Sequence, residues 1–476
     1  MKLSYFSPAD YANAIRNMIA QGQLEAALID ICLRAEAIKN DPMTFSRIMG
    51  SPTFDKLCAE LGEALRLTRQ PAESRRQDSS PARAIYICTE TLRSGGHTRV
   101  VADLIRAAPE FAHHVILTNL WERPTLHTKE FESLGAEVSI LPKASMFDKL
   151  GMLIDHLNSY AGARVFLLNH HQDGVAVAAV GASRQQQRYF IHHCDYLFCL
   201  GVFLPDVTHV DLHSMGFRDC RNNQKIDHNV YWPITCEDDA RFKSDGFLGA
   251  GQLVTCCCGD EHKFTGRYPI DYIDTIAEML RVTGGKHIHI GALQQPLKQR
   301  LYAKLTTVGV AAEKFVHFPH VPNLRLALLD LGVDAYITSF PIGGGRAVVE
   351  AMSAGIPVVG HLHHHNNTLG GTDMLPEAAP CWSSPTELLA ILQSLDANAL
   401  RTLSTASRER YEVYHHPRLL SQGLHGEVLP LPPQRIADAE ALQVFLFEKF
   451  FLTAPAAQPA VSFSSSWRLG NSAMPT

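Results

Sequence analysis

The sequence predicts an α/β protein with two doubly wound parallel sheets, preceded by a helical region. Short, continuous apolar runs alternate with helix-length amphipathic stretches from residue 84 onward, and the alternation restarts near residue 246. Continuous apolar strands are buried on both faces, and helices between them favour a parallel sheet covered on both sides. Two such series, of about 150 residues each, fit two doubly wound domains that face a cleft.

The composition is that of an ordinary globular protein and excludes several other classes. Of 476 residues, 46% are apolar and 19% are charged, and 43 basic residues against 48 acidic ones give a formal charge of −5. This balance excludes a mainly disordered chain, a collagen-like fibre and a strongly basic protein that binds nucleic acid through its phosphates. We therefore expect no nucleic-acid partner.

Three observations predict a cytoplasmic protein. No apolar run approaches the roughly 20 residues that span a bilayer. The N-terminus lacks the apolar core of a secretion signal. The 11 cysteines are an odd number without the paired spacing of a zinc site, which favours reduced thiols.

The sequence begins with a helical extension at residues 1–66. Its apolar positions recur at steps of three and four residues, which is the pattern of amphipathic helices packed on one another. A polar stretch with Pro, Ser and Arg follows, and we interpret residues 67–83 as a linker. The extension is a candidate surface for a protein partner.

The two β/α series occupy residues 84–245 and 246–400, and helices are predicted for residues 401–453. The last of these helices (ALQVFLFEKFFL) is too short to span a membrane. It either packs on a domain surface or makes a peripheral contact with a membrane. The tail at 454–476 is rich in Ala, Pro and Ser and is predicted to be disordered.

Open parallel sheets bind ligands beyond the carboxyl ends of their strands, so glycine turns after strands are candidate binding loops. Gly95 and Gly96 follow the first strand of the first series (AIYICT) and open a helix. Such a turn offers free N–H groups to an anion or a sugar hydroxyl, although it can also serve the architecture alone. The sequence is not GxGxxG and lacks the acidic residue expected about 20 positions later, which disfavours a nicotinamide cofactor.

A second glycine turn is the most specific segment of the chain. Gly343, Gly344 and Gly345 follow the strand DAYIT and precede a helix that begins near Arg346. Three glycines bring backbone amides within reach of a diphosphate at the positive end of the helix, and Arg346 adds a charged contact. Glu350, one turn later, either accepts hydrogen bonds from ribose hydroxyls or stabilises the helix dipole.

The order of these segments resembles a glycosyltransferase of the GT-B fold, which has two Rossmann-like domains, and is closest to the retaining nucleotide-sugar group known as group 1 or family 4. The resemblance covers residues 84–400 and is strongest at SFPIGGGRAVVEAMSAGIPVV, which is similar to the donor-binding signature. The turn at Gly95 and Gly96 resembles the acceptor-side loop. The strand ending near His170 (VFLLNHH) resembles a family strand that ends in His, and Lys263 stands where the donor domain carries its Lys.

Two departures from the family pattern leave the stereochemistry open. The family signature has two glutamates eight positions apart. The second matches Glu350, but the first falls on Ile342, which cannot hydrogen-bond a sugar. The Arg that precedes the family Lys by five positions is Cys258 here. Retention of configuration is therefore in doubt, since some inverting members of the fold also lack the first glutamate.

Two histidines at the end of the strand RYFI are candidate catalytic residues. Either His192 or His193 can bind the donor or acceptor and act as the base if the reaction inverts. Because side chains alternate along a strand, only one of the pair faces the ligand, and the resemblance favours His193. A hydrogen-bonded packing histidine is the alternative. His170 is a weaker candidate on the acceptor side, and we predict no metal site.

The resemblance implies an enzyme that transfers a sugar from a UDP- or GDP-linked donor to a glycan, glycolipid or protein. Lys263, Arg346 and the amides of the triple-glycine turn would stabilise the leaving diphosphate without an obligatory metal or other cofactor. One alternative is a nucleotide-sugar epimerase of the same fold, although we find no clear pair of acids for it. Another is a non-catalytic scaffold. The inner face of a membrane is the alternative to a free cytoplasmic location.

Overall fold

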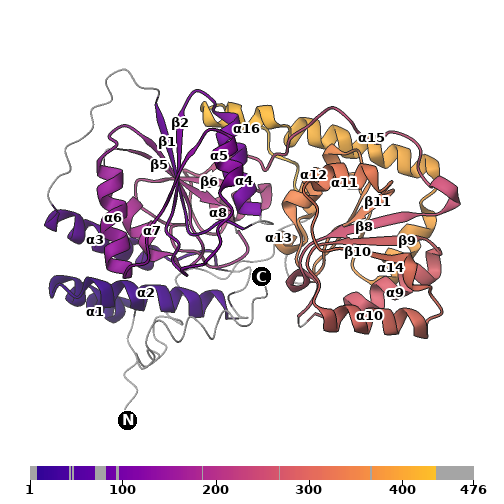
Figure 1. Cartoon of the computed structure of the whole chain (residues 1–476), viewed down its shortest axis with the longest axis horizontal. Coiled ribbons are helices and arrows are strands. Elements are labelled where there is room, and N and C mark those ends of the chain that lie inside the picture. The colour runs from indigo at the N-terminus through magenta and orange to yellow at the C-terminus, as the bar shows by residue number, and fades with distance from the viewer. Residues whose placement is uncertain are drawn as a thin grey trace, which may run out of the picture. The chain divides into compact units, whose positions relative to one another are not determined.

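Two sheets of parallel strands, each with helices between its strands, make up the fold (Figure 1). The described residues of 8–92 and 110–209 form one compact unit, and those of 96–109 and 210–435 form a second, with the division inside strand β6 (Thr208–Asp211). The computed structural model describes residues 8–41, 44, 48–69, 82–92, 96–184, 186–193, 195–266, 268–364 and 367–435.

The first sheet has the strand order β3-β2-β1-β4-β5-β6-β7. Strand β1 pairs in parallel with β2 on one side and β4 on the other, so that Tyr86 lies between Val115 and Phe166. The strand order therefore reverses direction between β1 and β4. Besides β6, the strands and helices of this series are β1 (Arg83–Cys88), α4 (Gly96–Ala107), β2 (Ala112–Leu117), α5 (Lys129–Ser133), β3 (Glu137–Ile140), α6 (Met146–Asn158), β4 (Arg164–Leu168), α7 (Gly174–Ala182), β5 (Gln187–His192), α8 (Ser214–Asn222) and β7 (Val230–Tyr231).

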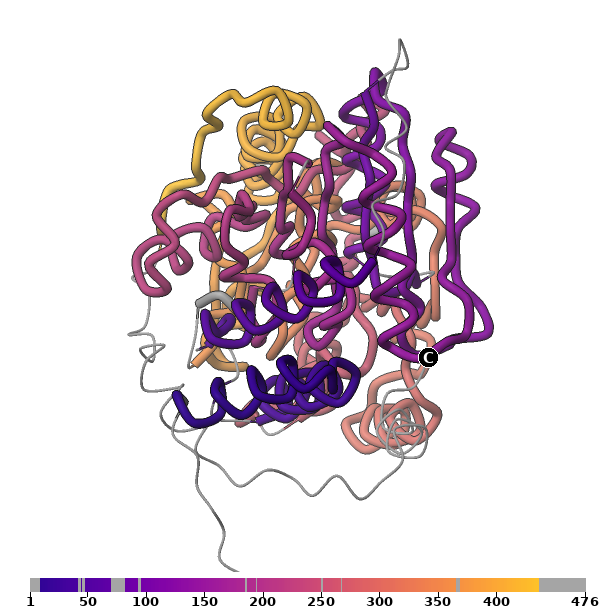
Figure 2. The backbone as a smooth tube through the Cα atoms, turned by 90° about the vertical axis from the view of Figure 1, so that its left-hand side faces the viewer, coloured from indigo at the N-terminus to yellow at the C-terminus, as the bar shows by residue number. Residues whose placement is uncertain are grey.

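The N-terminal helices are an integral layer of the first unit. They are α1 (Pro8–Ala20), α2 (Leu24–Lys39) and α3 (Pro52–Thr68), the indigo segment in Figure 2. Helix α3 packs along α7, while α2 contacts both α6 and α7. Every residue of α7 (GVAVAAVGA) is buried. A helix with no polar face must be covered on all sides, and α3 covers the side of α7 that solvent would otherwise reach.

Glycine makes the close approach of α3 to α7 possible, because a methyl group on Gly62 would lie 2.0 Å from the carbonyl oxygen of Ala178. We expect Gly62→Ala to lower the free energy of unfolding by about 3 kcal/mol or more, since the obstructing atom belongs to a backbone that cannot rotate away. Urea unfolding followed by circular dichroism measures the change. Gly96→Ala is the control, because a methyl group there meets nothing within 4 Å. Equal stability of the two variants would contradict the packing described.

Asp55 of α3 anchors the loop that follows β5. Its carboxylate accepts hydrogen bonds from the amides of Gly201 and Phe203, each 2.7 Å long. Burial raises the pKa of Asp55 from its usual 3.8 to about 7, against the effect of these amides, which lower it. The folded chain therefore keeps a proton on Asp55 at pH values where the unfolded chain has lost it.

This proton linkage predicts a pH dependence of stability. Because the folded state binds more protons between about pH 4 and pH 7, the contribution of Asp55 to stability is largest at low pH and falls as the pH rises through that window. We expect Asp55→Asn to flatten the decline in the free energy of unfolding across this window, measured by urea titration at several pH values. Asp227→Asn, at a carboxylate that is 93% exposed, is the control. An unchanged decline in Asp55→Asn would overturn the assignment.

The second sheet repeats the order of the first, as β10-β9-β8-β11-β12-β13. Strand β8 pairs in parallel with β9 and β11, so the order reverses between β8 and β11. The elements are η1 (Gly249–Gly251), β8 (Val254–Cys258), η2 (Glu261–Lys263), α9 (Tyr272–Thr283), β9 (Lys286–Ile290), α10 (Gln295–Thr307), η3 (Ala312–Lys314), β10 (Phe315–Phe318), α11 (Leu324–Asp330), β11 (Ala335–Ile337), α12 (Gly345–Ser353), β12 (Val358–His361), α13 (Asn367–Gly370), η4 (Thr372–Met374), β13 (Cys381–Trp382), α14 (Pro385–Ser394), α15 (Ala397–Tyr414) and α16 (Pro417–Leu424).

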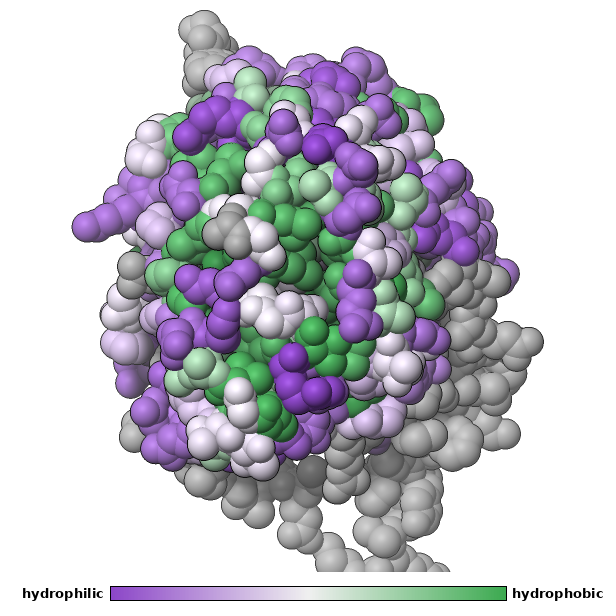
Figure 3. Space-filling model, turned by 90° about the vertical axis from the view of Figure 1, so that its right-hand side faces the viewer, coloured by the Kyte–Doolittle hydropathy of each residue, from purple (hydrophilic) through white to green (hydrophobic). Residues whose placement is uncertain are grey.

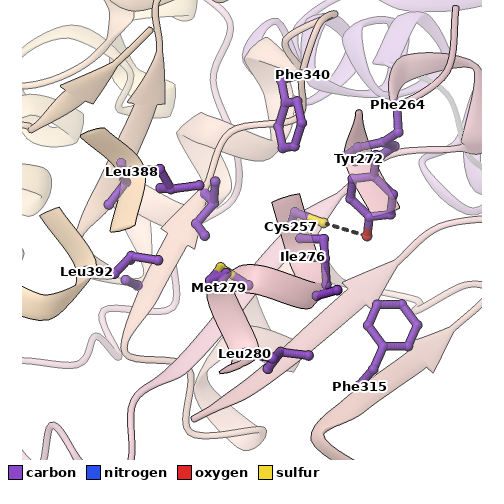
Figure 4. Packing of buried hydrophobic residues seen from close by; sticks show 14 of the residues in the cluster. Cys257, Phe264, Tyr272, Ile276, Met279, Leu280, Phe315, Phe340, Leu388 and Leu392 are labelled. Atoms are coloured by element: carbon purple, nitrogen blue, oxygen red, sulfur yellow. Dashed lines mark hydrogen bonds between the residues drawn. The ribbon is translucent and has the colours of Figure 1, made fainter. Parts of the chain in front are cut away.

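The core of the second unit extends up to its candidate binding loops. Figure 4 shows Phe264 and Phe340 packed with Tyr272, whose hydroxyl lies 3.8 Å from the sulfur of Cys257. Phe264 directly follows Lys263, and Phe340 lies three positions before Gly343, so the core fixes the base of both loops. On the face seen in Figure 3, hydrophobic residues reach the surface between hydrophilic ones.

The predicted fold class, two doubly wound parallel sheets with an N-terminal helical region, is confirmed. Residues 70–81 of the expected linker lie outside the described residues, as do 436–476, which include the apolar run and the tail. The domain boundaries stay predictions. Among the described residues, no helix combines the length and the apolar character needed to cross a membrane.

Candidate functional site

The reversal of strand order in the second sheet places two loops side by side. Strand β8 leads into η2, which ends at Lys263, and its neighbour β11 leads into the triple-glycine turn before α12. The crevice outside the carboxyl ends of two such strands is where open α/β sheets bind ligands. The loops predicted from the sequence as donor-binding segments are thus neighbours at this edge.

Lys263 and the glycine turn are in direct contact. The Lys263 ammonium donates to the carbonyl oxygen of Gly343 at 3.4 Å, and the amide of Ile342 donates to the carbonyl oxygen of Lys263 at 3.3 Å. A methyl group on Gly344 would lie 3.0 Å from the ammonium nitrogen. The ammonium therefore lies against the turn that opens α12, where first-turn amides have no partner within the helix.

The turn also requires a glycine at position 343. Its amide donates to the carbonyl oxygen of Leu369 at 2.7 Å, and a methyl group on Gly343 would lie 2.7 Å from that same oxygen. A neighbouring backbone thus approaches too closely for any side chain. The turn is held from two sides, by Lys263 and by the segment at Leu369, and the amide of Gly343 is engaged by Leu369 rather than offered to a ligand.

Glu350 and Lys263 share the surroundings of Cys258, the residue at the position of the missing family Arg. Desolvation and the charge of the Glu350 carboxylate together raise the pKa of the Cys258 thiol to about 12, against the Lys263 ammonium, which lowers it. The carboxylate and the ammonium therefore act on one locality at the end of β8. Cys258 itself is a neutral thiol at physiological pH and contributes no positive charge for a phosphate.

His213 is a further residue of this locality, and the sequence analysis gave it no role. It precedes α8, and a methyl group on Gly345 would lie 2.6 Å from its Nε2 atom. The imidazole therefore reaches the first residue of α12. His209, Asp211 and His213 alternate along the sequence, but no local pattern relates them to a glycine turn more than 130 residues away.

Arg346 is engaged by two carboxylates. Its guanidinium forms an ion pair with Asp103 of α4 and another with Glu350, 3.0 Å away. Burial lowers the pKa of Arg346, but the two carboxylates outweigh this effect and raise it. Burial raises the pKa of Asp103 despite the opposing charge of Arg346. The predicted phosphate contacts of Arg346 and Glu350 stay predictions, because these side chains bind each other here.

On the first sheet, His192 is the last residue of β5 and is buried, whereas His193 follows the strand and is half-buried. The Nδ1 atom of His193 lies 3.2 Å from the carbonyl oxygen of Ile191. Since a carbonyl only accepts, Nδ1 carries the proton, and Nε2 is the acceptor nitrogen of the neutral ring. That tautomer suits a base, so the structure is compatible with the preference for His193, which stays a prediction.

His170 follows β4, and Gly96 is the exposed first residue of α4, while Gly95 lies outside the described residues. His171 is half-buried, and desolvation of its ring lowers its pKa well below the usual value, with the charges of Lys39, His193 and His192 adding to the effect. His170 is also half-buried, at 22% exposed, and its Nδ1 lies 3.7 Å from the carboxylate of Glu90.

Glu90 lies two positions after the buried strand β1, and the sequence analysis gave it no role, because a single acidic residue after a strand is not a specific signal. Its side chain is only 2% exposed and forms an ion pair with Arg123. Burial raises the pKa of Glu90, and the Arg123 charge opposes that rise. A glutamate is rarely buried to this extent unless it is paired, and Arg123 supplies the pair.

Solved structures with the same fold are glycosyltransferases and related proteins. A mutant O-GlcNAc transferase of Thermobaculum terrenum aligns at a TM-score of 0.51 and 12% identity, covering 88% of this chain and 83% of that one. Anabaena Alr3699/HepE in complex with UDP and glucose aligns at 0.53 and 13%, covering 72% and 98%. The lipopolysaccharide outer core galactosyltransferase WaaB in its apo form aligns at 0.52 and 11%, covering 72% and 98%.

These likenesses define the fold. Strand order, glycine turn and structural neighbours together show that the chain has the GT-B glycosyltransferase fold, as the resemblance implied. No family model and no curated protein matches the sequence.

Proposed function

We propose that this protein is a glycosyltransferase that moves a sugar from a nucleoside-diphosphate sugar to an acceptor hydroxyl. The observation that carries the proposal is the Lys263 ammonium, held against the triple-glycine turn at the start of α12. A cation and a helix N-terminus at one strand-order reversal form a site for a diphosphate. A UDP-linked donor is the first to test, because HepE structures contain UDP and UDP-glucose.

In the proposed reaction, the acceptor oxygen bonds to the anomeric carbon, and the bond from that carbon to the phosphate oxygen breaks. The electron pair of the broken bond goes to the diphosphate, whose charge Lys263 and the first-turn amides of α12 stabilise. The proton of the acceptor hydroxyl must leave to a base. His193 is the proposed base if the configuration inverts, since its Nε2 is the acceptor nitrogen of the neutral ring.

The test is a thermal-shift panel of UDP-glucose, UDP-N-acetylglucosamine and GDP-mannose, followed by product analysis without an added acceptor. We expect at least one donor to stabilise the protein by about 2.7 kcal/mol at a hundredfold excess over its Kd. We also expect slow release of free nucleoside diphosphate. Isomerised sugar in the products would indicate an epimerase instead. Failure of every donor to bind would reject the proposal and favour a scaffold.

A further inference from the structure

The three central loops at the carboxyl edge of the first sheet are tied together by one buried carboxylate. Asp173, at the start of α7, accepts hydrogen bonds from the hydroxyls of Thr89, after β1, and Thr118, after β2, at 2.7 and 2.6 Å. The amide of His170, after β4, donates to the Thr89 hydroxyl at 2.8 Å. Asp173 also accepts from the amide of Ala176 at 3.0 Å. This network fixes the start of each of the three loops, and therefore the position of the residues that follow.

The loop after β2 is further held in a conformation that ordinary residues rarely adopt. Asn119 and Glu122 have positive φ angles of 44° and 50°. The buried Lys149 ammonium donates to the carbonyl oxygens of Thr118 and Asn119 at 3.1 and 2.6 Å, and Glu122 pairs with Lys143 at 3.0 Å. Left-handed conformations at non-glycine residues cost of order 1–3 kcal/mol each and cluster at binding sites.

The residues that this scaffold presents are an aromatic ring, an imidazole and a carboxylate. The ring centroids of Trp121 and His170 lie 5.1 Å apart, and His170 Nδ1 lies 3.7 Å from the Glu90 carboxylate. Arg123 pairs with the same carboxylate and so balances its charge. All four residues belong to the loops after β1, β2 and β4, at the reversal of strand order in this sheet, where open α/β sheets bind ligands.

We propose that Trp121, His170 and Glu90 form a subsite for an uncharged saccharide, which makes the acceptor of the proposed transferase a glycan. The role of this saccharide as the acceptor rests on the proposed function, whereas the binding of a saccharide does not. A pyranose has an apolar C–H face and a rim of hydroxyls. The half-buried indole of Trp121 offers a flat apolar surface with a polar edge, and the imidazole of His170 offers a partner for a hydroxyl beside the buried Glu90 carboxylate.

Charge decides against the other acceptor classes. Arg123 is engaged by the Glu90 carboxylate, so this ion pair offers a phosphate or a carboxylate on the acceptor no net positive charge. An anionic group would give up hydration in a partly desolvated site without gaining a counter-ion from this pair. A neutral ring meets no such cost. The geometry therefore points to a neutral sugar rather than to a lipid phosphate or an acidic peptide.

The experiment titrates the full-length protein with maltose, cellobiose, chitobiose and lactose, using saturation-transfer difference NMR and calorimetry. We expect at least one disaccharide to bind, and Trp121→Ala to weaken its binding at least tenfold. Trp121→Phe keeps an aromatic face and should retain most of the affinity. Glu90→Gln removes the charge with little change in shape and should also weaken binding. Phe242→Ala, which removes an aromatic ring that is 46% exposed in the second unit, is the matched control.

Disaccharide binding by the wild-type protein and by the two Trp121 variants decides whether the subsite exists. Binding lost in Trp121→Ala but kept in Trp121→Phe supports the subsite, provided that circular dichroism shows both variants folded. Unchanged binding in Trp121→Ala, no binding of any disaccharide by the wild-type protein, or tighter binding of glucose 6-phosphate than of the neutral sugars would overturn it. UDP is titrated in parallel. If the wild-type protein bound a disaccharide but not UDP, the proposed function would be rejected and the subsite would stand.

Discussion

Replacing Lys263 with alanine should weaken the binding of UDP by between about tenfold and a hundredfold, the equivalent of one hydrogen bond to a charged group. The reason is geometric, because the Lys263 ammonium is the cation in contact with the glycine turn before α12. Calorimetric titration with UDP measures the effect. Gly344→Ala should produce a smaller loss, since its methyl group would lie 3.0 Å from the ammonium nitrogen and displace it.

The matched control for this prediction is Lys286→Ala, which removes an exposed lysine at the start of β9. UDP affinity should be the same in this variant and in the wild-type protein. If Lys263→Ala also bound UDP with wild-type affinity, the diphosphate would not lie at this turn, and the donor assignment would fail. Urea unfolding of each variant separates a loss of affinity from a loss of folded protein.

Much of the fold could be predicted because its strands carry an unambiguous local signal. Strand β8 (VTCCC) is a short, continuous run of small apolar residues, which suits a strand buried on both faces. Helix α7 shows the limit of such reasoning. Its sequence (GVAVAAVGA) has no polar positions and therefore no helical periodicity. What makes it a buried helix is the packing of α3, which lies more than 100 residues earlier in the sequence.

The candidate sites divide in the same way. The triple-glycine turn and Lys263 could be found, because glycine and a cation in those positions are local features of the sequence. Glu90 and His213 could not be given a role, since a single charged or polar residue after a strand has no meaning until the strand order is known. Asp173 becomes central only because the order β2-β1-β4 brings three loops to it.

Arg346 is the residue for which local and tertiary information disagree most. A cation next to a glycine turn at a helix start predicts a phosphate contact. The tertiary structure supplies Asp103, 243 residues away in sequence, as a buried partner. No pattern near Arg346 signals that partner. The two roles make opposite predictions for what happens when the guanidinium is removed.

If the ion pairs hold Arg346 in place for structural reasons, Arg346→Met should lower the free energy of unfolding by about 3–5 kcal/mol, because it leaves buried carboxylates without their cation. Asp103 retains Arg106 at 3.5 Å, which places the expected loss toward the lower end of that range. The double variant Asp103→Asn with Arg346→Met removes both charges and should be more stable than the sum of the two single losses predicts. Urea unfolding of the four proteins forms the cycle.

Titration of the same four proteins with UDP distinguishes the structural role from a phosphate contact. A structural Arg346 predicts a large loss of stability, with UDP affinity falling no more in Arg346→Met than in Asp103→Asn. A phosphate-binding Arg346 predicts the reverse, with near-normal stability and a loss of affinity confined to the variants that lack the guanidinium. Because Lys263 already lies at the glycine turn, we expect the first result. The diphosphate charge would then be stabilised by one lysine and the helix amides, with Arg346 keeping Glu350 in position.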